Sequence, residues 1–141
     1  MKILIAIDGS KSAQRAVKYA IVLAKHLAAP PHITLVTVHD DTGLRHLAKR
    51  LPKNGLEDYF RDLSDHDLKP TRKLLDKAGV PHDMVIKLGH VVEEILATAN
   101  SEKFDLLVLG SKGRSGLSDL VLGSVAHRLI ALARQPVVLV K

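Results

Sequence analysis

Short runs of apolar residues, separated by longer amphipathic segments, dominate the pattern of this chain. Four runs are nearly continuous, at residues 2–7, 33–38, 104–109 and 136–140, and a weaker run at 83–88 alternates between polar and apolar positions. Runs rich in β-branched residues are typical of strands that helices cover on both faces. We therefore predict five strands, most of them buried.

Segments with a helical period lie between these runs. The clearest is 12–27, and residues 91–100 and 120–133 behave similarly. In the first of them the apolar positions share one stripe, which comprises Ala13, Ala16, Val17, Ala20, Ile21, Ala24 and Leu27. Strands and helices thus alternate along the chain, and this order predicts one α/β domain over residues 1–141, a three-layer α/β/α sandwich with a parallel sheet and right-handed crossovers.

Residues 41–68 interrupt the alternation, and we treat them as a variable insertion. A Pro-Lys-Asn-Gly turn at 52–55 breaks the pattern, and 56–63 is expected to form a short helix. Proline is tolerated in a first helical turn, so a separate helix is expected from Pro70 to Ala78, ended by Gly79.

Composition narrows the classes of function. Aromatic residues make up 3% of the 141 residues and tryptophan is absent, so the chain lacks the surface on which single-stranded nucleic acids stack. The net charge of +6 is spread along the chain, which favours solvated helix faces or an anionic ligand over a nucleic-acid partner. The absence of cysteine excludes thiol nucleophiles and cysteine-based metal sites.

The distribution of apolar residues also bears on location. No stretch approaches the ~20 apolar residues that span a bilayer, and the first apolar run is too short for a signal peptide. We expect a cytoplasmic protein without membrane insertion.

Candidate chemistry lies just after the strands, because open parallel sheets bind ligands at the carboxyl ends of their strands. The richest such segment is 110–116, where Gly110, Gly113 and Gly116 would let backbone N–H groups approach an anion, and Lys112 and Arg114 add positive charge. A glycine inside the following helical segment indicates close packing or a helix that begins at Ser124. From periodicity alone, a surface turn without a ligand explains Gly110, Gly113 and Gly116 as well as an anion site does.

Two common nucleotide-binding motifs are absent from the chain, which disfavours the enzyme classes that use them. The chain contains neither the GxxxxGK[ST] motif of P-loop NTPases nor a GxGxxG after its first strand. No nucleophile has an evident base and orienting group, so we assign no catalytic residue.

The spacing Gly110-x2-Gly113-x9-Gly123-Ser124 resembles the nucleotide signature of the universal stress protein (UspA-like) family, in its ATP-binding branch. The resemblance extends to the start (KILIAIDGSKSAQRAVKYA), the second strand (ITLVTVHD), the AGVP turn and the ending QPVVLVK. Only residues from about 41 to 68 carry no specific resemblance to the family.

The resemblance implies a Rossmann-like fold of the adenine nucleotide alpha-hydrolase type, with strand order 3-2-1-4-5. It also implies that ATP binds with Mg²⁺ or Mn²⁺, which the phosphates rather than protein side chains hold. The nucleotide-binding residues that it implies are Ala6, Ile7 and Asp8, Val38, Gly110, Ser111, Gly113 and Arg114, and Gly123, Ser124 and Val125. Ala126 departs from the polar residue common in the family, so one hydrogen bond to the ligand is expected to be missing.

Several residues have plainer roles open to them. Asp8 fits a turn that caps the first helix as well as a ligand contact, and Ser10 is the better cap. The segment 39–41 (His-Asp-Asp) is expected to be solvated loop rather than a metal site, and His127 an exposed helical residue rather than a general base.

The last strand is expected to be a sheet edge, and edges of this kind need a partner. The resemblance implies a homodimer through residues 136–141. We expect an ATP-binding regulatory module of the stress response that signals to an unknown protein partner and hydrolyses ATP slowly at most. The alternatives are a metal-dependent ATPase and an adaptor that binds no nucleotide.

Overall fold

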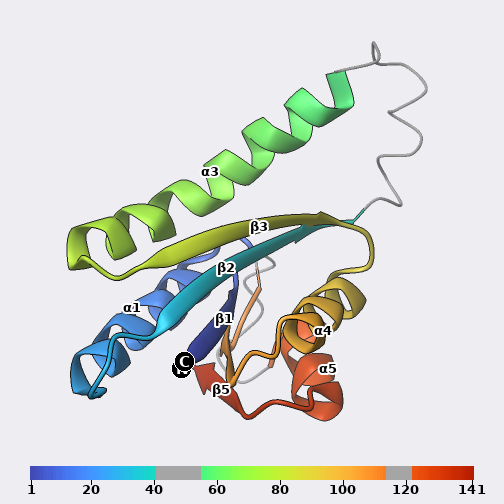
Figure 1. Cartoon of the computed structure of the whole chain (residues 1–141). Coiled ribbons are helices and arrows are strands. Elements are labelled where there is room, and N and C mark those ends of the chain that lie inside the picture. Colours follow the sequence, from blue (N-terminus) through green and yellow to red (C-terminus); the bar gives the residue numbers. More distant parts are fainter. Residues whose placement is uncertain (41–54, 114–121) are drawn as a thin grey trace.

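The computed structural model describes residues 1–40, 55–113 and 122–141, and these form a five-stranded sheet with helices on both faces (Figure 1). All strands are parallel and their order is β3-β2-β1-β4-β5, as predicted. The elements in chain order are β1 (Lys2–Ala6), α1 (Lys11–His26), β2 (His32–His39), α3 (Gly55–Ala78), β3 (His82–Leu88), α4 (Val91–Ser101), β4 (Leu106–Gly110), α5 (Ser124–Leu132) and β5 (Val137–Val140).

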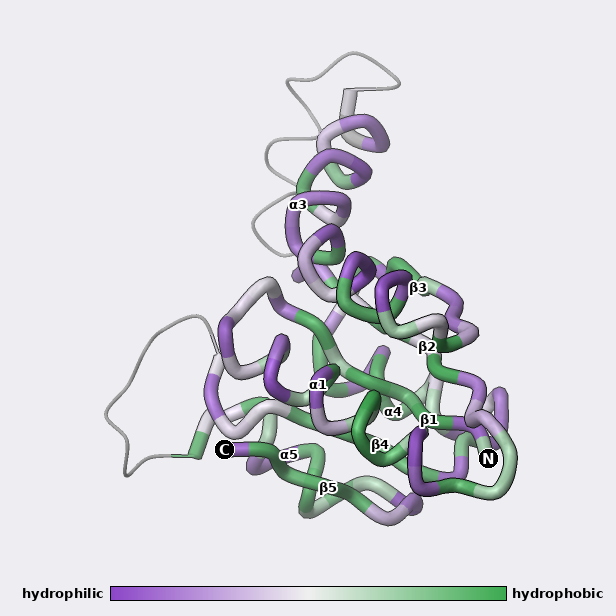
Figure 2. The backbone as a smooth tube through the Cα atoms, turned by 90° about the vertical axis from the view of Figure 1, so that its left-hand side faces the viewer, coloured by the Kyte–Doolittle hydropathy of each residue, from purple (hydrophilic) through white to green (hydrophobic). Residues whose placement is uncertain are grey.

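Two apolar clusters hold the three layers together, one on each face of the sheet. The cluster under α1 and α3 contains Ile5, Val17, Leu35 and Leu75, all of them fully buried. The cluster under α4 and α5 is built in the same way on the opposite face, around Leu4, Val36, Ile95, Leu107 and Leu129. Neighbouring residues of one strand therefore serve opposite faces, which explains why β1 and β4 are almost entirely apolar and why Thr34 and Thr37 of β2 are buried. Figure 2 shows the hydrophobic segments gathered in these strands.

The long helix α3 corrects the prediction of two helices in this region. It runs unbroken through Gly55–Ala78 with Pro70 inside it, although proline removes the hydrogen bond to the carbonyl four residues earlier. Pro70 is exposed, whereas a buried stripe (Ser64, Leu68, Thr71, Leu75) continues on the other side of the helix. Packing of that stripe outweighs the ~3 kcal/mol that an interior proline costs. The helix ends as predicted before Gly79, whose φ is +65°.

The first helix begins at a conventional cap. The Ser10 hydroxyl accepts a hydrogen bond from the Ala13 N–H at 3.1 Å, so Ser10 is the N-cap, as predicted.

Replacing Ser10 by alanine is expected to lower the free energy of unfolding by about 1 kcal/mol, because the Ala13 N–H loses its partner. Urea denaturation measures this loss, and Ser10→Asp, which keeps a capping oxygen, is the control. Equal losses in the two variants would contradict the capping role.

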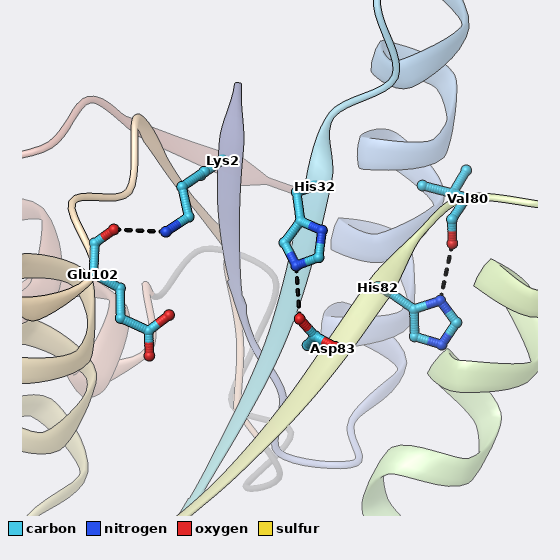
Figure 3. A network of polar contacts seen from close by, with 6 residues as sticks. All are labelled: Lys2, His32, Val80, His82, Asp83 and Glu102. Carbon is cyan, nitrogen blue, oxygen red and sulfur yellow. Dashed lines mark hydrogen bonds and ion pairs between the residues drawn. The ribbon is translucent and has the colours of Figure 1, made fainter.

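Polar contacts tie the elements together at the amino ends of the strands (Figure 3). The Lys2 ammonium donates to the Glu102 carbonyl at 2.8 Å, and the His32 ring lies 2.7 Å from the Asp83 carboxylate between β2 and β3. The His82 ring contacts the Val80 carbonyl at 2.9 Å. These contacts are structural, and the candidate site lies at the opposite ends of the strands.

Within the described ranges, no helix is long and apolar enough to cross a membrane.

Candidate functional site

A cavity of about 730 Å³ opens at the carboxyl ends of the strands, between the starts of α1 and α5. This volume is within the range of small-molecule sites. Its floor is apolar. Val36 and Val38 of β2, Leu109 of β4 and Ile95 of α4 contribute to it. Nine of the residues expected from the sequence line it, and they are Ala6, Ile7, Asp8, Val38, Gly110, Gly113, Gly123, Ser124 and Val125.

Ser111, another expected residue, does not line the cavity. Ser111 is buried and acts through its backbone, since its N–H donates to the Val140 carbonyl at 2.8 Å and its carbonyl accepts from the Gly123 N–H at 2.9 Å. These bonds attach the segment after β4 to β5 and to the start of α5. Arg114 lies outside the described residues.

Gly110 has a packing role that the sequence did not reveal. A Cβ at this position would lie 2.6 Å from the carbonyl carbon and the hydroxyl of Ser12, closer than real Cβ atoms approach other atoms. The Ser12 hydroxyl also accepts a hydrogen bond from the Lys112 N–H at 3.2 Å. The first turn of α1 therefore lies directly on the end of β4, and only glycine permits this approach.

Asp8 connects the first strand to the glycine segment. One oxygen of its carboxylate accepts the Ser10 N–H at 2.9 Å, in a turn that leads into α1. The other oxygen would lie 3.5 Å from a Cβ placed on Gly113. Asp8 thus has the turn role considered above, and its position in the cavity wall leaves the ligand contact as a prediction.

The start of α5 points its backbone at the cavity. The helix begins at Ser124, as the glycine at 123 indicated, and the cap residue Gly123 provides no side-chain hydrogen bond to the first turn. The N–H groups of a first turn have no partners within the helix and carry partial positive charge, which makes them suited to anions. Lys112 lines the same cavity. This end of the cavity is suited to phosphate.

His39 was predicted wrongly as solvated loop. Its side chain is 8% exposed, its ring nitrogen lies 2.9 Å from the Ser64 hydroxyl, and the ring packs against Phe60 at 5.9 Å between centroids. The error arose because α3 covers the end of β2, and α3 begins in the insertion that the sequence left undefined. Asp40 is exposed, as expected, and Asp41 lies outside the described residues.

The cavity wall also contains residues that the sequence analysis did not assign to the ligand. Asp67 of α3 was not considered, whereas His39 and Asp40 were expected in solvated loop, and all three line the cavity. The exposed His127 lies on the first turn of α5, in the wall near the expected phosphate position. In the described part of the chain, no group of three or more His, Cys, Asp or Glu residues could hold a metal ion.

Comparisons with known proteins agree on one family. The model of the Universal stress protein family matches residues 1–141. The chain is 32% identical to Universal stress protein YxiE of Bacillus subtilis, over 99% of this chain and 98% of that protein. It is 34% identical to Universal stress protein MJ0531 of Methanocaldococcus jannaschii, over 99% and 81% of the two chains.

Solved structures agree with the fold. The structure of MJ0577 from M. jannaschii superposes with a TM-score of 0.84 at 26% identity, over 99% of this chain and 94% of that one. More distant matches include an Arabidopsis thaliana family member with AMP bound and an Archaeoglobus fulgidus universal stress protein in complex with dAMP. They have TM-scores of 0.69 and 0.66 at 20% and 21% identity and cover 100% of this chain, and 91% and 98% of theirs. At that identity the likeness shows the fold alone.

Proposed function

Because this chain belongs to the universal stress protein family, we propose that it is a nucleotide-binding regulatory protein that takes ATP into the cavity at the carboxyl ends of its strands. The observation that carries the proposal is the two-part cavity. It has an apolar floor at one end, and at the other it has a glycine segment that meets a helix start.

The two parts match the two ends of a nucleotide. Val38 and Leu109 offer apolar surface of the kind that accepts a base, and the Asp8 carboxylate in the cavity wall would accept hydrogen bonds from a ribose. Gly113, Gly123 and the first turn of α5 offer N–H groups to phosphates.

The choice of an adenine nucleotide rests on the family. Two of the more distant structural relatives contain AMP and dAMP, which share a base with ATP. A bound nucleotide would bring Mg²⁺ or Mn²⁺ with its phosphates, and the metal would neutralise part of their charge. The protein's own residues would position the phosphates, and we assign none of them to chemistry.

Regulation would act through a dimer. Strand β5 ends the sheet, and its Val140 pairs with Gly110 at the phosphate end of the cavity. We propose that two chains pair through residues 136–141 in the cytoplasm and that ATP, by contacting Gly110 and Gly113 beside β5, changes the dimer surface that a protein partner recognises. Slow hydrolysis would reset this state.

The test is mass spectrometry of small molecules released from the denatured protein, together with calorimetric titration with ATP–Mg²⁺, ADP, AMP and cyclic AMP. Released ATP, or micromolar binding of ATP–Mg²⁺, is expected. No released nucleotide and no heat with any of the four ligands would overturn the proposal and leave the fold untouched.

Ser124→Ala is expected to weaken ATP binding about tenfold, because a hydroxyl that donates to a charged phosphate is lost from the helix start. Calorimetry measures the change. Ser101→Ala, at the far end of α4, is the matched control and should bind normally. Equal affinities in all three proteins would remove Ser124 from the site.

A further inference from the structure

The outer strand β3 carries an exposed apolar surface that neither the core nor the proposed nucleotide site uses. Its residues Met84, Ile86 and Leu88 are 41%, 46% and 46% exposed, which is unusual for large apolar side chains at alternate positions of one strand. Val85, between them, points to the other face and packs into the core with α4. The three exposed side chains therefore share the face on which α3 lies.

The backbone of the same three residues lies at the open edge of the sheet. The Pro81 carbonyl accepts the Ile33 N–H at 3.2 Å, and the Gly89 N–H donates to the His39 carbonyl at 3.0 Å, so the odd-numbered positions face β2. The backbone groups of successive residues in a strand point to opposite sides of the strand. The N–H and C=O groups of Met84, Ile86 and Leu88 therefore point away from β2. Strand β3 ends the sheet, so no described strand pairs with this side.

A groove of about 320 Å³ follows this edge between β3 and the first turns of α3. Glu57, Phe60 and Arg61 line it from the helix, and Ile86, Lys87 and Leu88 line it from the strand. We call this surface, together with Met84, the edge groove. Figure 2 shows the start of α3 extending away from the sheet.

Among the described residues, the start of α3 beside the edge groove has a net charge opposite to that of the whole protein. The first turns of α3 carry Glu57, Asp58, Asp62 and Asp65, all exposed, whereas the chain as a whole has a net charge of +6. The Arg61 guanidinium lies 3.7 Å from the Asp58 carboxylate, which offsets its charge. The described residues of α3 at the rim are therefore acidic. The side chain of Lys87 lies on the same face of β3 as Val85, away from α3.

We propose that the edge groove binds an extended segment of a partner protein in which apolar residues alternate with lysine or arginine. The segment adds a strand to β3 through the outward N–H and C=O groups, as in other cases of β-strand addition. Its apolar side chains cover Met84, Ile86 and Leu88, whose two-residue spacing matches that of an extended chain. Its cations face the acidic residues of α3.

The test uses a fluorescein-labelled peptide of alternating lysine and valine, blocked at both ends, and measures anisotropy with the full chain at low salt. A peptide of alternating glutamate and valine is the control for charge. The lysine peptide is expected to bind and the glutamate peptide to bind at least about tenfold more weakly. Equal binding of the two, or no binding of either, would overturn the proposal.

Two variants locate the binding. Ile86→Thr keeps a β-branched residue and Glu57→Lys reverses one rim charge, and each is expected to raise the Kd at least about fivefold. Their matched controls, Val22→Thr on α1 and Glu93→Lys on α4, change exposed residues outside the groove and should bind as the wild type does. Unchanged binding in Ile86→Thr and Glu57→Lys would contradict the assignment.

Sedimentation of the protein without peptide tests whether a second copy of the chain occupies the edge groove instead. If the wild type self-associates and Ile86→Thr abolishes this, a second copy of the chain occupies the groove and the proposed partner is wrong. If Ile86→Thr leaves the sedimentation unchanged, the groove is open for the basic segment.

Discussion

Gly110→Ala is expected to lower the free energy of unfolding by about 3 kcal/mol, the upper end of what overpacking usually costs. The added Cβ would lie 2.6 Å from the Ser12 carbonyl carbon and 2.8 Å from its carbonyl oxygen. Both atoms are backbone, so relief requires the first turn of α1 to move off the end of β4. Because Ser12 also holds the Lys112 N–H, that movement would loosen one wall of the cavity.

Urea denaturation measures the loss, and Gly123→Ala is the matched control. A Cβ at Gly123 would have its nearest neighbours at 3.4–3.6 Å, which is ordinary contact, so the loss should be only about 0.5 kcal/mol, from the poorer helix cap. Adding Ser12→Ala to Gly110→Ala should not restore stability, since it removes the hydroxyl but leaves the backbone atoms in place. A loss below 1 kcal/mol in Gly110→Ala, or its full rescue by Ser12→Ala, would show that the helix moves easily.

Val38→Trp is expected to weaken ATP binding about a hundredfold or more while the protein stays folded. Val38 lies on β2, is only partly buried, and faces the apolar floor of the cavity. An indole there occupies volume in an opening rather than in the packed core, so it excludes the base at little cost in stability.

Calorimetry with ATP–Mg²⁺ gives the affinity, and thermal unfolding followed by circular dichroism confirms the fold. Val22→Trp is the control, because Val22 is 52% exposed on α1 and does not line the cavity. Wild-type affinity in Val38→Trp would mean that the base does not enter beside β2, even if the phosphates bind near α5.

The order of elements was predictable because each buried strand has a continuous apolar run and each covering helix has one apolar stripe. The apolar runs 33–38 and 104–109 agree with the strands His32–His39 and Leu106–Gly110 to within two residues at each end. The same logic failed for α3, where Pro70 and Gly55 are locally strong breakers. The buried stripe through Ser64, Leu68 and Leu75 decided the matter, and it is recognisable only once β2 and α1 lie beside it.

The sequence predicted one part of the candidate site and not the other. The glycine spacing and the carboxyl-end rule placed Asp8, Gly113 and Ser124 in one cavity wall, because parallel strands bring their ends together whatever the loops do. The contribution of α3 to the site, through His39 and Asp67, depended on an element whose path the sequence left open.

The sequence by itself therefore determined the parallel α/β sandwich, its strand order through the family resemblance, and the end of the sheet where a ligand belongs. These follow from periodicity and turn residues, which are local. Only the tertiary structure decided that Gly110 is needed to seat α1 on β4, that α3 continues through Pro70, and that β3 leaves an apolar edge under an acidic helix. Each of these depends on which atoms far apart in the chain come within contact, and no local pattern encodes that distance.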